Sequence, residues 1–144
     1  GEDKDRDRLA LRKLTELMTR PFVQIVILGA VTVCVVDAVL AVISEQTQTP
    51  YSSFIPISIL IVVIFGFVSA RRCGLLFALL CGAILGFVDS TIGWSISWNI
   101  GPGDPGVELS FSEIVYTVIT VTAMDAVVGL IGGLFSKLFP PQSH

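Results

Sequence analysis

The sequence predicts an all-α membrane protein, a bundle of four transmembrane helices, and three observations carry this prediction. The first is composition: 53% of the residues are hydrophobic, 15% are charged and the mean hydropathy is +0.82, which lies outside the range of soluble domains. The second is a set of four apolar stretches, each near the roughly 20 residues that a helix needs to cross the hydrocarbon. The third is that residues 59–68 and 75–88 are apolar on every helical face, so a soluble bundle would leave them no polar side to turn toward water.

Each predicted helix has recognisable limits. The apolar stretches place the four helices at 22–44, 53–70, 74–97 and 111–138. Pro21 is expected to open the first helix and Pro56 to lie in the first turn of the second, because no backbone N–H is needed at these positions. The glycines and prolines of 99–106 exclude a helix there, and Ser110 with Glu113 has the spacing of a capping box that starts the last helix.

Residues 1–20 precede the transmembrane domain, which is expected to cover 21–139 and to be followed by a short tail, 140–144. Charges of both signs alternate over the first eight residues. From Leu9 onward, apolar residues fall on one helical face and mainly basic residues on the other, as in an amphipathic helix. This N-terminal cytoplasmic amphipathic helix is expected to lie along the inner membrane surface, and docking onto a partner protein is the alternative.

The basic residues predict the orientation in the membrane. Lysines and arginines flank the helices at one end only, at Arg12, Lys13, Arg20, Arg71, Arg72 and Lys137, whereas the loops 45–52 and 98–110 contain none. By the positive-inside rule, both termini are expected to be cytoplasmic. The predicted location is therefore an integral, multi-pass position in the lipid bilayer.

Three aspartates, Asp37, Asp89 and Asp125, lie alone within the apolar stretches. An ionised carboxylate in hydrocarbon costs at least about 2.5 to 3.5 kcal/mol, so these residues need a physical reason. Counted from the basic ends of their helices at about 1.5 Å per residue, the three acids lie at a depth of about 19 to 22 Å. They therefore share one layer, somewhat past the midplane of the membrane. We therefore expect the three acids to converge inside the bilayer as one cluster.

Small residues share the helical faces of the acids. Such residues let helices approach closely in lipid, and the pairs at 82 and 86 and at 129 and 133 have the small-xxx-small spacing that supports these contacts. The first, third and fourth helices are therefore expected to meet through these faces, and the second helix to face lipid or a neighbouring subunit. The expected packing residues are Gly82, Gly86, Gly93, Gly129, Gly132 and Gly133.

No Lys, Arg or His lies inside the spans, away from their ends, to pair with the acids. The carboxyl groups must therefore be protonated, reached by water or bound to a cation. If protonated, they can donate to backbone carbonyls or to the hydroxyls of Ser90 and Thr122 and hold the helices together. If partly ionised, Asp37, Asp89 and Asp125 are candidates, with these two hydroxyls, for an ion- or proton-binding site.

In length, in its four spans and in an aspartate on each of the third and fourth helices, Asp89 and Asp125, the chain resembles the lipoprotein signal peptidases. That resemblance would imply an intramembrane aspartyl protease whose two acids share a proton. The family places asparagines beside its acids, whereas the only asparagine here is Asn99, in the loop before the last helix. A protease is therefore a remote alternative, and we do not expect an enzyme.

Other chemistry has no support in the sequence. The only histidine is His144, so no transmembrane imidazole can hold a haem, and no zinc-binding spacing of His and Cys occurs. The segment 101–106 lacks the strand before it and the Lys-Ser/Thr after it that a phosphate-binding loop needs. No basic patch lies outside the membrane-flanking residues, so nucleic-acid binding is not expected. We expect no cofactor and no metal site.

Two classes of function remain. The first is a non-enzymatic subunit or helix-packing component of a membrane assembly, as a homo-oligomer or with other membrane subunits, because four glycine-faced helices with short loops leave little room for an independent catalytic centre. The alternative is a small proton- or cation-coupled transporter or channel that uses Asp37, Asp89 and Asp125.

Overall fold

The computed structural model describes residues 2–101 and 109–139, with side chains from residue 19 onward. Within these ranges every regular element is helical. The elements, in chain order, are α1 (Glu2–Thr47), the 3-10 turn η1 (Tyr51–Phe54), α2 (Ile55–Cys73), α3 (Leu75–Val88), the π-helical turn η2 (Asp89–Gly93), α4 (Trp94–Ile100) and α5 (Phe111–Leu138). The predicted all-α fold class is confirmed.

Four segments of the described chain are long and apolar enough to cross a membrane: Thr19–Thr47, Tyr51–Cys73, Leu75–Ile100 and Phe111–Leu138. They coincide with the four predicted helices to within three residues at each end. Large apolar side chains on their outer faces are exposed, for example Leu28 at 61% and Leu76 at 67%, and soluble monomers rarely expose contiguous apolar surface of this extent. The protein is a multi-pass membrane protein.

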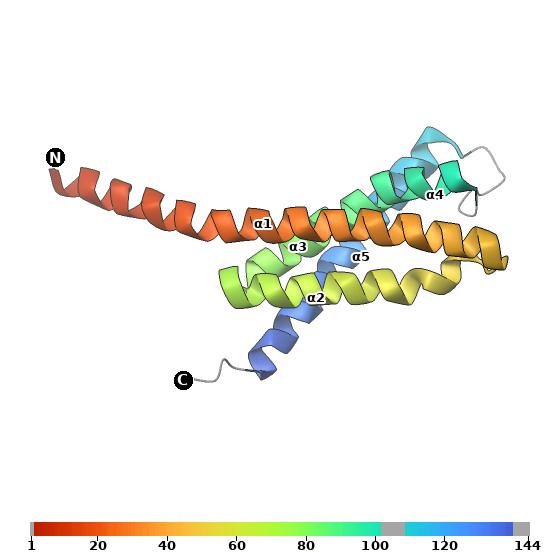
Figure 1. Ribbon diagram of the computed structural model, residues 1–144. Helices are drawn as coiled ribbons and strands as arrows, with labels where there is room; N and C mark the ends of the chain where they lie inside the picture. Colours follow the sequence, from red (N-terminus) through yellow and green to blue (C-terminus); the bar gives the residue numbers. More distant parts are fainter. Residues whose placement is uncertain (1, 102–108, 140–144) are drawn as a thin grey trace.

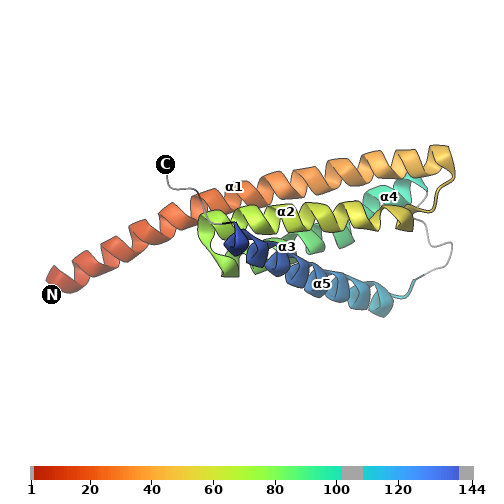
Figure 2. The ribbon, with the colours of Figure 1, turned by 90° about the horizontal axis from the view of Figure 1, so that it is seen from below.

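The middle of the bundle is formed by α2 and α3, with α1 on one side and α5 on the other (Figure 2). α5 packs on α2 and α3 and crosses them obliquely (Figure 1). α1 packs on α2, α3 and α4 and, among the described residues, makes no contact with α5. A small apolar core of Ile25, Val62, Cys81 and Leu85 lies between α1, α2 and α3.

The position of α2 differs from the prediction. The sequence suggests that the second helix faces lipid or a neighbouring subunit, but α2 packs against both α3 and α5. Its buried residues are Val62, Gly66, Ser69 and Cys73, a stripe of mostly small side chains at helical spacing. A Cβ atom on Gly66 would lie 2.8 Å from the Cα atom of Gly129 in α5. The prediction rested on the absence of charge and on β-branched residues, and it overlooked this stripe of small residues.

Glycines bring the backbone of α5 into direct contact with α3 and α2. A Cβ atom on Gly129 would lie 2.6 Å from the carbonyl oxygen of Ala78 and 2.8 Å from the Cα atom of Gly82. On the α2 side, Gly132 faces the backbone of Val63. A larger residue at Gly129 would therefore force the helices apart. We call the contact formed by Gly82, Gly129 and Gly132 the glycine crossing.

α1 is a single helix of 46 residues. The segment 1–20, expected as a separate element, is continuous with the first transmembrane helix, and Pro21 lies inside the helix instead of opening it. A proline inside a helix removes one backbone hydrogen bond and its ring crowds the preceding turn, but the residues on both sides remain helical. The N-terminal part of α1 therefore leaves the bundle as part of one gently bent rod and extends beyond the other helices (Figures 1 and 2).

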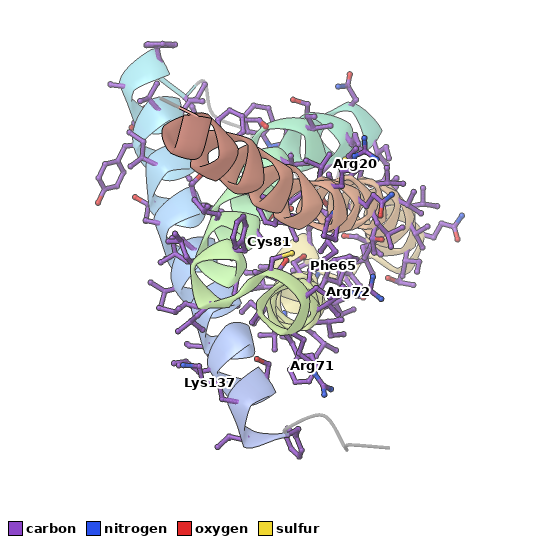
Figure 3. All side chains as sticks on the ribbon, turned by 90° about the vertical axis from the view of Figure 1, so that its left-hand side faces the viewer. Arg20, Phe65, Arg71, Arg72, Cys81 and Lys137 are labelled. Atoms are coloured by element: carbon purple, nitrogen blue, oxygen red, sulfur yellow. The ribbon has the colours of Figure 1, made fainter. Side chains whose placement is uncertain are left out.

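The two ends of the bundle differ in charge. Four exposed basic side chains mark one end, here called the basic end, and point away from the bundle (Figure 3): Arg20, Arg71, Arg72 and Lys137. The opposite end, here called the loop end, consists of residues 45–54, 98–101 and 109–110 and has no Lys or Arg in these ranges. Since four segments cross, the transmembrane part of α1 begins and α5 ends at the basic end.

The predicted capping box at the start of α5 is confirmed. The backbone N–H of Ser110 donates to Oε2 of Glu113 at 2.8 Å, and the backbone N–H of Glu113 donates to Oγ of Ser110 at 3.4 Å. N–H groups in the first turn have no earlier carbonyl to bond, so side chains must satisfy them. The cap therefore sets the residue at which α5 begins.

We expect Gly129→Val to destabilise the bundle, because the new side chain would meet the backbone of α3 at the glycine crossing. The free energy of unfolding, measured by SDS denaturation in mixed micelles, should fall by at least about 2 kcal/mol. The matched control is Ala123→Val on the exposed face of the same helix, which should change it by less than about 0.5 kcal/mol. Equal effects of the two substitutions would contradict the role of the crossing.

Candidate functional site

A cavity of about 690 Å³ lies between the first turns of α2, the segment formed by η2 and α4, and the middle of α5. It reaches from Pro50, Trp98 and Leu109 at the loop end to Asp89 and Asp125. The other lining residues are Tyr51, Ser52, Phe54, Ile55, Ser58, Ile59, Trp94, Ser97, Val121, Met124 and Val128. Among the described residues, the wall is therefore mostly apolar, with two carboxyl groups and no basic side chain.

The oblique path of α5 creates this cavity. At the glycine crossing the backbones of α5, α3 and α2 touch, and from there toward the loop end α5 diverges from α2 (Figure 2). Along the diverging part, α5 presents Val121, Met124 and Val128 to the cavity, side chains that are too large for backbone contact. The space between the helices widens where the acidic residues lie.

Two acids form the charged part of the wall. Asp89 is the first residue of η2, and π-helical turns are rare and occur frequently at functional sites. Asp125 lies opposite Gly86 of α3, where a Cβ atom would be 2.7 Å from Oδ2 of the aspartate. Both carboxyl groups are partly exposed, so a molecule in the cavity can reach them.

Asp37 lies behind this wall. Its side chain is 1% exposed. Tyr51, which lines the cavity, donates a hydrogen bond from its Oη to Oδ1 of Asp37 at 3.2 Å. Oδ2 of Asp37 has no hydrogen-bond donor among the described residues, and leaving such an atom buried costs about 1–3 kcal/mol, more if the group is charged.

The carboxyl groups of Asp37 and Asp89 contact each other beside Gly93. A Cβ atom on Gly93 would meet Oδ2 of Asp37 and would lie 3.0 Å from Oδ1 of Asp89, so both carboxyl groups lie beside the same glycine. Two ionised carboxylates can only accept hydrogen bonds, so this contact becomes a hydrogen bond when one of the acids carries a proton. We call Asp37 and Asp89 the acid pair. The missing side chain at Gly93 leaves the room for it.

The buried cluster of three acids predicted from the sequence is not formed. Only Asp37 is buried, and no group of three acidic, histidine or cysteine side chains in the described residues is arranged to hold a metal ion. Asp37 contacts Gly93, whereas Asp125 contacts Gly86, which is seven residues, or about 10 Å, nearer the basic end of the same segment. The predicted single layer is therefore wrong. It assumed that the first and fourth helices meet, but α2 and α3 separate α1 from α5.

The two predicted hydroxyl partners lie near the acids without bonding to them. Ser90 is buried, and its Oγ donates to the carbonyl oxygen of Phe87 at 3.3 Å. Oγ1 of Thr122 has no hydrogen-bond partner among the described residues. Of the predicted packing residues, Gly133 packs on the Cβ atom of Ala78, on the side of the glycine crossing away from the cavity.

Three residues of the cavity wall do not stand out as site residues in the sequence. Trp94 and Trp98, whose ring centroids are 6.0 Å apart, resemble aromatic residues that anchor a helix at the membrane surface. Ser97 is 1% exposed and lines the cavity, and its Oγ has no hydrogen-bond partner among the described residues. The sequence does contain one indication for Ser97: it shares a helical face with Asp89 and Gly93, because the three residues follow one another at four-residue spacing.

The acid pair also differs from the arrangement that the resemblance to lipoprotein signal peptidases suggests. That resemblance rests on one aspartate in each of the third and fourth spans, here Asp89 and Asp125. The carboxyl group that lies with Asp89 beside Gly93 belongs instead to Asp37, in the first span. No protein-family model, curated protein or solved structure matches this chain.

We expect Tyr51→Phe to destabilise the protein, because it removes the hydroxyl that donates to buried Asp37. The free energy of unfolding in mixed micelles should fall by about 1–3 kcal/mol. Tyr116→Phe is the control, since that ring is 72% exposed, and it should change the value by less than about 0.5 kcal/mol. A Tyr51 variant as stable as the Tyr116 variant would show that this hydrogen bond contributes nothing.

Proposed function

We propose that this protein is a small proton-linked cation transporter, with the cation held at Asp89 and Asp125 and the proton held by the acid pair. The single observation that carries the proposal is the position of Asp89. Asp89 lines the cavity, and its carboxyl group lies beside Gly93, next to the buried carboxyl group of Asp37. A cation in the cavity therefore acts directly on Asp89, whereas the neighbouring Asp37 is buried and does not line the cavity.

Electrostatics links the cation to the proton at this site. Two carboxylates about 4 Å apart repel by about 4 kcal/mol at an effective dielectric constant of 20, and no basic side chain lines the cavity among the described residues. In the empty protein, a proton shared by Asp37 and Asp89 removes this repulsion. A cation beside Asp89 removes it as well, so cation binding favours release of the proton. The affinity for the cation should therefore rise with pH.

Tyr51 directs the shared proton. Its hydroxyl donates to Oδ1 of Asp37, so Oδ1 acts as an acceptor. The proton then lies between Oδ2 of Asp37 and the carboxyl group of Asp89, the contact beside Gly93. Release of the proton leads through Asp89 toward the cavity, since Asp37 itself is buried.

The orientation of the chain in the membrane determines the side from which the cation enters. With the basic end in the cytoplasm, as the positive-inside rule favours, both termini are cytoplasmic and the cavity lies in the outer half of the membrane. In this orientation the cation enters from the outside, at a loop end that has no Lys or Arg in its described residues to repel it.

We expect Asp89→Asn and Asp125→Asn to abolish proton-linked cation flux. The measurement is the internal pH of reconstituted vesicles after a cation gradient is imposed, with Glu45→Gln as the control because Glu45 is an exposed acid at the loop end. Flux through both site variants equal to that of the control would refute the proposal.

Asp37→Asn separates cation binding from proton movement in the same experiment. Its amide can donate to Asp89 without a transferable proton, so this variant should still bind the cation but should move no proton in exchange. Proton movement at the level of the unsubstituted protein would remove Asp37 from the mechanism.

A second candidate function is a subunit of a larger membrane assembly. The observation that favours it is the part of α1 that extends beyond the other helices (Figures 1 and 2). A helix that projects from the bundle in this way offers a surface on which another subunit could pack. We expect affinity purification from native membranes in mild detergent to recover partner subunits with the full chain and to lose them when residues 2–18 are deleted. Purification of the full chain as a monomer without partners would count against this function.

A further inference from the structure

We propose that the cation is organic and amphipathic: an ammonium head group on an aromatic or aliphatic body about the size of one or two rings. This inference rests on the transport function proposed above and names its substrate class. It is carried by the size of the cavity, by the position of its polar groups and by the chemistry of its walls.

The size of the cavity favours an organic ion over a small inorganic one. A volume of about 690 Å³ falls within the roughly 300–1,000 Å³ of sites for drug-sized ligands. A bare metal ion would fill little of it and would need several oxygen ligands at about 2.0–2.6 Å. Among the described residues, no three acidic, histidine or cysteine side chains are grouped to supply them.

The charged groups of the cavity lie on the third span and on α5. Asp89 and Asp125 supply negative charge, and Ser97 lies two turns beyond Asp89 on the same helical face. The Oγ of Ser97 is buried and has no hydrogen-bond partner among the described residues. Burying a hydroxyl without a partner is unfavourable, so the part of the wall two turns from Asp89 favours a cation whose body carries a hydrogen-bonding group.

The rest of the wall suits the body of such a cation. Trp94, Trp98 and Phe54 present aromatic faces or edges, and Met124 adds a flexible apolar side chain that adapts to different shapes. Aromatic faces also attract cations, by about 0.5–2 kcal/mol each. No Lys or Arg lines the cavity among the described residues, so nothing in this wall favours an anion.

Intrinsic fluorescence gives a direct test, because the chain has only two tryptophans, Trp94 and Trp98, and both line the cavity. The full chain in phosphatidylcholine nanodiscs is titrated at pH 7 with 4-phenylbutylammonium, 4-phenylbutan-1-ol and 4-phenylbutanoate. These probes share one hydrocarbon body and differ in charge. We expect a saturable change in emission with the ammonium ion at a Kd at least about tenfold lower than with the alcohol, and no saturation with the carboxylate.

Variants then locate the site. Asp89→Asn and Asp125→Asn should each raise the Kd for 4-phenylbutylammonium at least about tenfold, and the control Glu45→Gln should leave it within about twofold. Calorimetry of the unsubstituted protein in two buffers of different ionisation enthalpy should report proton release on binding. The comparison of the three probes needs no variant, so it decides the proposal even if a variant fails to fold.

Three outcomes would overturn the inference. Equal affinity for the ammonium ion and the alcohol would mean that the cavity holds only apolar molecules such as lipid chains. Tight binding that is unchanged in both aspartate variants would place the site elsewhere. If 4-phenylbutylammonium does not bind but proton-linked flux of Na⁺ or K⁺ requires Asp89 and Asp125, the substrate class is wrong and the proposed transport function stands; if that flux is also absent, both fail.

Discussion

The contact between glycine backbones at one level of the bundle determines most of this structure. Where Gly82, Gly129 and Gly132 bring α5 against α3 and α2, the helices have no side chains between them. In lipid, where water does not drive helices together, such close van der Waals contact is a main source of association. A helix held at one point of a bundle and tilted must diverge from its neighbours elsewhere. The divergence of α5 toward the loop end (Figure 2) is the geometric consequence, and the cavity lies there.

Glycine serves a second purpose beside the acids. Gly86 and Gly93 lie on the third span where the carboxyl groups of Asp125 and Asp37 approach it. Each missing side chain makes room for a carboxyl group from another helix, so small residues here accommodate charge as well as helix packing. Asp89, between the two glycines, is the point at which the buried acid and the cavity meet. A residue with a Cβ atom at Gly93 would separate the acid pair.

The site retains polar atoms that the fold does not satisfy. Oγ of Ser97 has no hydrogen-bond partner among the described residues, and Oδ2 of Asp37 has none unless the acid pair carries a proton. Each buried atom left without a partner costs about 1–3 kcal/mol. Native proteins pair the great majority of buried polar atoms. Two such atoms within one small region are therefore consistent with a site that exchanges protons and binds a polar ligand, because the proton or the ligand would satisfy these atoms only while it is bound.

The sequence alone determined the fold class, the four spans and the cap of α5, because these depend on local properties: the length of apolar runs, the spacing of polar residues and the chemistry of a helix start. It also singled out Asp37, Asp89 and Asp125, since a lone carboxyl group in an apolar run is visible without any structure. Only the tertiary structure decided which helices touch. It placed α2 between α1 and α5, with Gly66 against Gly129, brought Asp37 beside Asp89 at Gly93 instead of gathering three acids, and brought Tyr51 onto Asp37. Helical periodicity gives the face on which a residue lies, but the partner of that face depends on how closely every pair of backbones can approach, which is a property of the whole bundle.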